Sequence, residues 1–71
     1  MDNASKSFVV YSPNEAACND GAGFWSNMSG WSAFEHATTF SAVERESFPL
    51  PASIGNDARF VRWQHAHAHC G

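Results

Sequence analysis

Half of the ten aromatic residues of this 71-residue chain lie in one stretch, GFWSNMSGWSAFEHATTF at residues 23–40. Aromatic residues stand on both sides of a short polar segment, Asn27 to Gly30, and Gly30 can take the positive φ that closes a tight turn. This pattern is typical of a β-hairpin, in which each ring adds roughly 150–250 Å² of apolar surface to a small core. The stretch therefore predicts a hairpin, with residues 37–40 as a bent continuation of its second arm.

Two further strands are predicted outside the hairpin. The run FVVY at 8–11 is β-branched and aromatic and ends at a Ser-Pro-Asn turn. Residues 58–63 alternate so that Val61 and Trp63 face the core together. Residues 14–23 are small and polar, and they predict a mobile loop between the first strand and the hairpin.

One short helix is predicted to begin after Ser41. Ser41 and Glu44 fit a capping box, in which each side chain accepts a hydrogen bond from the backbone N–H of the other residue. The helix should end before Phe48, because Pro49 disfavours helical geometry in the residue that precedes it. Val43 and Phe48 are expected on its buried side. Together these elements predict an α+β fold, a three- or four-stranded antiparallel sheet with one short helix.

The length of the chain sets its domain organisation. Seventy-one residues suffice for one small domain, expected at residues 8–63, with a flexible N-terminus at 1–7 and a histidine-rich tail at 64–71. A core this small often leaves apolar surface uncovered, and self-association is the ordinary way to cover it. We therefore expect a protein partner or a second copy on that surface, with a homodimer as the leading expectation.

The charge and the N-terminus argue against nucleic acid and membrane as partners. Seven acidic and four basic residues give a formal charge of −3, and so few cations do not form a phosphate-binding surface. The acidic residues are too dispersed for a mimic of DNA charge. Because residues 1–7 contain no apolar run of signal-peptide or membrane-span length, we expect a cytoplasmic protein with Cys18 and Cys70 reduced.

The tail, QHAHAHCG at 64–71, carries the one pattern with ligand chemistry. In an extended chain His65, His67 and His69 lie on one side, with the Cys70 thiol beside them, and such donors bind Zn²⁺ or Ni²⁺. In a helix only His65 and His69 share a face. A terminus of this composition is usually frayed, and histidine runs bind metal without a biological purpose. Both interpretations stay open, and no other cofactor is expected.

No residue pattern points to an enzyme. Glu35 and His36 are the one acid–histidine neighbour pair in the body of the chain, and in a strand they would face opposite ways. Cys18 lies in a small-residue segment suited to neither catalysis nor a disulfide bridge. The glycines at 21–23 precede a strand, whereas a phosphate-binding loop precedes a helix. We expect a non-enzymatic protein, and an enzyme whose site forms only at a dimer seam is the weaker alternative.

Several aromatic residues are expected to be core, namely Trp25, Trp31, Phe34 and Phe40. A narrow sheet cannot bury all of these rings, so part of an aromatic sheet face is expected to be exposed. Exposed rings beside Arg59 and Arg62 are typical of a protein-binding surface, where aromatic residues and arginine dominate the binding energy.

The chain also resembles small uncharacterised accessory proteins carried by plasmids, phages and integron cassettes. The motifs are GFWSN at 23–27, GW at 30–31, AT-x-F at 37–40, LP at 50–51 and NDARFV at 56–61. The likeness spans residues 8–63, and the segment 14–22 and the histidine tail depart from it. The resemblance implies a mobile genetic element and no activity. We therefore expect a protein-interaction module that acts through an exposed aromatic sheet face, with an anti-defence role as one form and a small metal-binding protein as the alternative.

Overall fold

The computed structural model describes the backbone of residues 7–70 and the side chains of residues 7–68, so residues 1–6 of the expected flexible N-terminus lie outside the described residues. The elements follow one another as β1 (Phe8–Tyr11), α1 (Pro13–Cys18), β2 (Phe24–Ser26), β3 (Gly30–Ser32), α2 (Ala42–Ser47), β4 (Arg59–Arg62) and α3 (Trp63–Cys70). Short 3₁₀ turns lie at Phe34–His36 (η2) and Ile54–Asn56 (η3).

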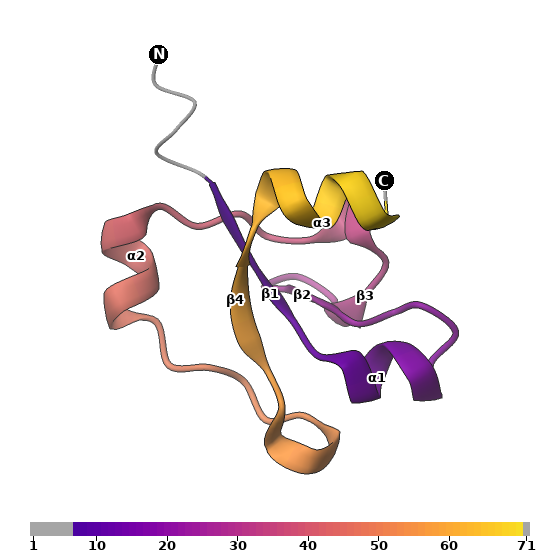
Figure 1. Cartoon of the computed structure of the whole chain (residues 1–71). Coiled ribbons are helices and arrows are strands. Elements are labelled where there is room, and N and C mark those ends of the chain that lie inside the picture. The colour runs from indigo at the N-terminus through magenta and orange to yellow at the C-terminus, as the bar shows by residue number, and fades with distance from the viewer. Residues whose placement is uncertain (1–6, 71) are drawn as a thin grey trace.

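The strands form a four-stranded antiparallel sheet in the order β3-β2-β1-β4 (Figure 1). This confirms the α+β class and the predicted hairpin, in which Trp25 lies opposite Trp31. Gly30 closes the turn with a φ of 80°. The hydroxyl of Ser26 accepts hydrogen bonds from the next backbone N–H groups of the turn, the first of them that of Met28 at 3.1 Å. The positive φ of Gly30 and the hydrogen bonds of the buried Ser26 hydroxyl therefore stabilise the turn of the hairpin.

One face of the sheet packs against α3 and holds the core cluster. Val9 is fully buried, Phe24 is 3% exposed, and Ala66 of α3 packs between them and solvent. Partly buried side chains complete the cluster: Tyr11, Phe34, Ala37 and Val61. The core is thus built from β1, β2 and a helix that lies more than 40 residues further along the chain.

The opposite face packs against the segment that follows the hairpin. Phe40 is 4% exposed, and its ring lies 4.6 Å from that of Phe48 and 5.5 Å from that of Phe60 between centroids. The guanidinium of Arg45 sits 4.6 Å from the centre of the Phe8 ring. Phe8 and Phe40 also form a backbone bridge, and the N–H of Thr38 donates to the carbonyl of Trp25 at 2.9 Å. The prediction that residues 37–40 continue the second hairpin arm is therefore wrong, because that arm ends at Ser32 and the turn η2 redirects the chain toward β1.

The prediction of a loop throughout residues 14–23 is wrong, because α1 begins at Pro13. The hydroxyl of Ser12 accepts the N–H of Glu15 at 3.1 Å, and proline in the first turn has the φ that a helix needs. The polar composition of this stretch predicts little packing, yet Glu15 is only 9% exposed. With α2 and α3, the described part of the chain has three short α-helices where one was predicted.

The histidine tail is also helical. Alanine has the highest helix propensity, and two alanines alternate with the histidines of α3. Ala66 is 4% exposed, so the described part of residues 64–71 packs on the sheet. Trp63, predicted to end the last strand, instead begins α3 and is 36% exposed. Val61 packs against the core cluster as predicted.

The helix α2 has the predicted boundaries and the predicted capping box. The Ser41 hydroxyl accepts the N–H of Glu44 at 3.1 Å, and the Glu44 carboxylate accepts the N–H of Ser41 at 2.8 Å. The prediction that Val43 is buried is wrong, since this side chain is 76% exposed. Arg45 and Phe48 make the inward contacts in its place, over the rings of Phe8 and Phe40.

Candidate functional site

The helical tail changes the geometry of the predicted metal ligands. Positions 65 and 69 lie one helical turn apart, whereas His67 lies on another side, and its ring stacks on Trp63 at 4.8 Å and 14°. The side chains of His69 and Cys70 lie outside the described residues. No group of three His, Cys, Asp or Glu side chains able to hold a metal ion occurs among those that are described. The metal site at His65, His67, His69 and Cys70 therefore stays a prediction.

Glu35 and His36 lie in the turn η2, and not in a strand. Their side chains approach at 3.3 Å between a Glu35 carboxylate oxygen and Nε2 of His36, and both are more than half exposed. Contacts between exposed charged side chains of this kind contribute about 0–1 kcal/mol to stability.

The aromatic residues of the hairpin form ring pairs. Trp25 and Trp31 meet edge to face with centroids 5.4 Å apart, and the indole N–H of Trp31 donates to the carbonyl of Ala52 at 3.0 Å. These two rings and that of Phe34 are half-buried, while Phe40 is buried as predicted. Other segments of the same chain therefore cover part of both sheet faces, and the exposed aromatic sheet face stays a prediction.

A polar network joins α1 to the turn η3. The hydroxyl of Ser12 donates to the Asp57 carboxylate, which also accepts the hydroxyl of Ser53 at 3.1 Å and the N–H of Asn14 at 2.9 Å. Glu15 accepts the N–H of Ile54 at 3.0 Å. Both carboxylates are satisfied by donors of the protein itself, so the network ties two distant segments together and is not a reactive pair.

Asp57 gives stability that is lost in acid. The Ser12 hydroxyl contributes most to a pKa of Asp57 below its ordinary value of 3.8, with Asn14 and Ser53 adding to it and burial opposing it. A pKa lowered by folding means that the stabilisation is complete above pH 3.8 and disappears as the pH falls through the folded value.

We expect D57N to have a lower melting temperature than the wild type at neutral pH, with a difference that shrinks below about pH 4. Thermal melts by circular dichroism between about pH 2 and about pH 7 measure it. The variant E46Q removes an exposed carboxylate from α2 and should differ little from the wild type at any pH. A D57N difference that stays constant over the whole range contradicts the role of the ionised carboxylate.

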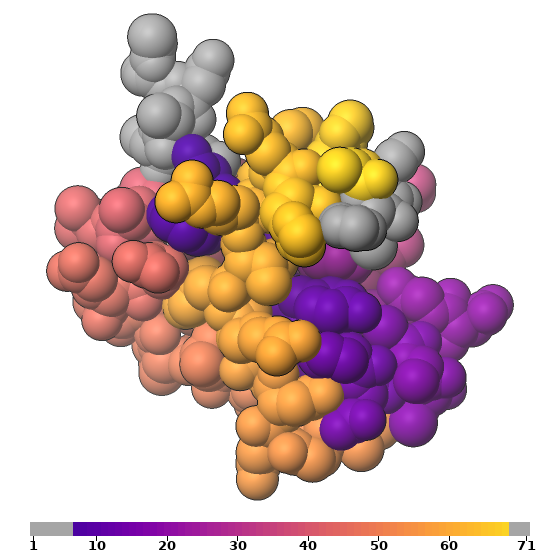
Figure 2. Space-filling view, in the orientation of Figure 1, coloured from indigo at the N-terminus to yellow at the C-terminus, as the bar shows by residue number. Residues whose placement is uncertain are grey.

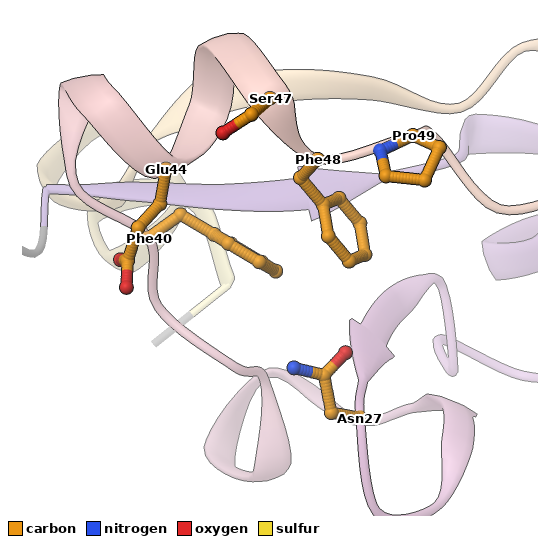
Figure 3. Close-up of a pocket in the computed structure, with 6 residues that line it drawn as sticks. All are labelled: Asn27, Phe40, Glu44, Ser47, Phe48 and Pro49. Atoms are coloured by element: carbon orange, nitrogen blue, oxygen red, sulfur yellow. The ribbon is translucent and has the colours of Figure 1, made fainter.

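A shallow pocket lies between α2 and the β2–β3 turn (Figure 3). Its volume is about 340 Å³, and it opens widely to solvent. The lining residues are Phe40, Phe48 and Pro49, with the polar Asn27, Glu44 and Ser47. Figure 3 shows the two phenylalanine rings beside each other, with the Asn27 amide pointing toward them from the turn. The pocket thus has an apolar floor and polar groups at its margin, as small binding sites do.

Three exposed apolar side chains belong to residues next in sequence to lining residues of this pocket, and we call them the apolar patch: Met28, Val43 and Leu50. They are 93%, 76% and 47% exposed. Each is the chain neighbour of a lining residue, since Met28 follows Asn27, Val43 precedes Glu44 and Leu50 follows Pro49. Single exposed apolar residues are ordinary, but several around one pocket mark an interaction surface.

Sequence reasoning missed the apolar patch. Val43 is expected in the core from the sequence, Met28 is only part of the predicted turn, and Leu50 is only part of a resemblance motif. The available signal was the position of Met28 at the tip of a predicted turn, because a side chain at a loop tip points to solvent in most folds. Leu50 lies between two prolines, which also keeps it out of regular structure.

Comparison with models of protein families, with curated proteins and with solved structures found no match to this chain. Each helix within residues 7–70 is too short or too polar to cross a lipid bilayer. The likeness to accessory proteins of mobile elements therefore stays a prediction from sequence.

Proposed function

We propose that the protein is a non-enzymatic interaction module that binds a segment of a partner protein at the apolar patch and the adjoining pocket. The observation that carries this proposal is the exposure of Met28, Val43 and Leu50, each of which is next in sequence to a residue lining the pocket whose floor is made by Phe40 and Phe48. Removing such side chains from water on binding is the main source of affinity at protein interfaces. The pocket receives one apolar side chain of the partner, and the apolar patch surrounds it.

The charges beside the pocket indicate the chemistry of the partner. Glu44 lines the pocket and Glu46 is exposed on the same helix, whereas the guanidinium of Arg45 between them lies over the Phe8 ring, in a chain with a formal charge of −3. Like charges meeting across an interface are unfavourable, so a second copy docked here through the same surface is disfavoured. The partner segment therefore carries an aromatic or aliphatic residue flanked by lysine or arginine. A mobile-element origin and an anti-defence role stay predictions, since neither follows from the patch.

Selection from a random displayed-peptide library tests this function. The wild-type protein serves as bait, and the variant M28Q/V43Q/L50Q serves for counter-selection. We expect enriched peptides with an apolar residue between basic residues, which bind the wild type at least about tenfold more tightly in calorimetry. The three side chains are exposed, so their replacement should leave the folded state within about 0.5 kcal/mol per site of the wild type.

The matched control is I54Q, because Ile54 is 47% exposed like Leu50 but lies in η3, away from the apolar patch. Peptides that bind I54Q and the wild type equally support the patch, and peptides that distinguish these two proteins count against it. Light scattering over a concentration range tests the homodimer expected from the sequence. A dimer that the triple variant loses would replace the proposed partner with a second copy.

A further inference from the structure

The outer edge of β4 is the second surface with a definable partner. β4 ends the strand order and pairs with β1 on one side. Figure 1 shows β4 in front of β1, and Figure 2 shows the atoms of residues 59–62, in orange, at the front of the molecule in the same view. No further strand pairs with this edge within residues 7–70. Such an edge offers backbone donors and acceptors to another chain.

The ladder identifies the backbone groups that face outward. The N–H of Trp63 donates to the carbonyl of Ser7, and Val61 lies opposite Val9, so the odd-numbered residues of β4 point their N–H and C=O toward β1. Because direction alternates along a strand, the N–H and C=O of Phe60 and the N–H of Arg62 point outward. Just before β4 begins at Arg59, the Ser53 hydroxyl already accepts the N–H of Ala58 at 3.1 Å. The open edge therefore runs from Phe60 to Arg62.

Two of the four basic residues of the chain, Arg59 and Arg62, are exposed at the two ends of this strand. Neither arginine forms an ion pair with any side chain that the structure describes. The edge is thus locally cationic on a chain whose formal charge is −3.

We propose that β4 binds an extended acidic peptide as a fifth, antiparallel strand. This inference goes beyond the proposed function, because it concerns a different surface and a different ligand. A second copy of β4 is a poor occupant, since an antiparallel pair of these strands gathers Arg59 and Arg62 of both copies along one seam, and like charges close together are unfavourable. The same two positions attract carboxylates.

The register gives the spacing of the acidic residues in the ligand. The partner residue opposite Phe60 exchanges two hydrogen bonds with it, and the residues opposite Arg59 and Arg62 are then three apart in the peptide. Since neighbours alternate between faces, these two acidic side chains lie on opposite faces of the sheet, each beside one arginine. The recognised pattern is an acidic residue, two β-forming residues and a second acidic residue.

Titration with the capped octapeptide TVETVETV tests the proposal on the full chain by ¹H–¹⁵N correlation spectra. We expect the largest shifts at the amides of Phe60 and Arg62 and slower hydrogen exchange at both. The peptide TVKTVKTV should bind at least about tenfold more weakly. The peptide TVETEVTV has the same composition but places both acidic residues on one face, so it should bind with intermediate affinity.

The variant R59E/R62E should bind the lysine peptide more tightly than the glutamate peptide. A purely structural role of the two arginines would not reverse the preference in this way. Both side chains are exposed, and unchanged core resonances of Val9 and Phe24 verify the fold. If the reversed variant does not fold, R59Q/R62Q should lose the preference for either peptide.

Equal binding of the acidic and basic peptides, or shifts confined to α2 and Met28, overturns the inference. Dimerisation through β4, seen as concentration-dependent shifts at Phe60 without peptide, overturns it in favour of a second copy. The peptide selection that tests the apolar patch is independent of this titration, because neither Arg59 nor Arg62 belongs to that patch. Failure of one experiment therefore leaves the other conclusion standing.

Discussion

Replacing Phe24 with alanine is expected to remove a large part of the free energy of unfolding of the protein. Phe24 is 3% exposed, and its ring lies 4.9 Å from that of Tyr11 and 5.2 Å from that of Phe34 between centroids. Truncation of a buried phenylalanine costs about 3–5 kcal/mol. A chain of this length has a free energy of unfolding of about 4–11 kcal/mol, so one ring accounts for much of it.

Urea unfolding followed by circular dichroism measures this loss. The variant F24L nearly conserves the volume and should cost less than about 1.5 kcal/mol. The variant M28A, at a side chain that is 93% exposed, should stay within about 0.5 kcal/mol of the wild type. If F24A and M28A unfold at the same urea concentration, Phe24 is not at the centre of the core and the described packing is wrong.

Adding one methyl group at Gly23 is expected to cost about 2–3 kcal/mol. A Cβ at this position would lie 2.6 Å from Cβ of Ala16 and 2.7 Å from the carbonyl oxygen of Ser12. Neither atom can give way cheaply, because Ser12 is fully buried and its N–H donates to the Gly23 carbonyl at 2.8 Å. The helix α1 would have to move away from the sheet and from the polar network around Asp57.

Thermal melts of G23A and G21A separate steric contact from backbone strain. Gly21 has a φ of +92°, and a Cβ there would meet nothing within 4 Å, so G21A carries only the conformational cost of about 1 kcal/mol. G23A should therefore be the less stable variant. A G23A protein as stable as G21A would show that α1 is not held against Gly23.

Sequence patterns were reliable where a few neighbouring residues decide the conformation. The helix α2 begins at the predicted cap, Ser41, and ends before Pro49, and Gly30 takes the positive φ that the hairpin pattern predicted. Both devices act over three or four residues and need no partner elsewhere in the chain. Composition was misleading in two places. The helix α1 is polar, yet the Ser12 cap and Pro13 start it. The histidine segment has the composition of a frayed terminus, yet Ala66 packs on the core.

The candidate site could not be predicted from the sequence, because exposure depends on contacts between distant segments. Val43 carries the apolar side chain of a core residue, yet Arg45 and Phe48 take the inward positions of its helix. The apolar patch exists only because the β2–β3 turn and the end of α2 come together at the pocket. The sequence pattern of neither segment indicates that the two segments come together.

The amino-acid sequence alone determined the antiparallel α+β class, the hairpin and the capped helix, because turn glycines, caps and alternating apolar residues act on their own neighbourhood. The tertiary structure alone decided which apolar side chains remain in water and which backbone edge stays open. Ser12 reaches Asp57 across 45 positions of the chain, and Ala66 reaches Val9 across the sheet. Burial depends on such long-range contacts. The local sequence sets only the conformational preferences of each segment, and the long-range contacts decide which of these preferences is realised.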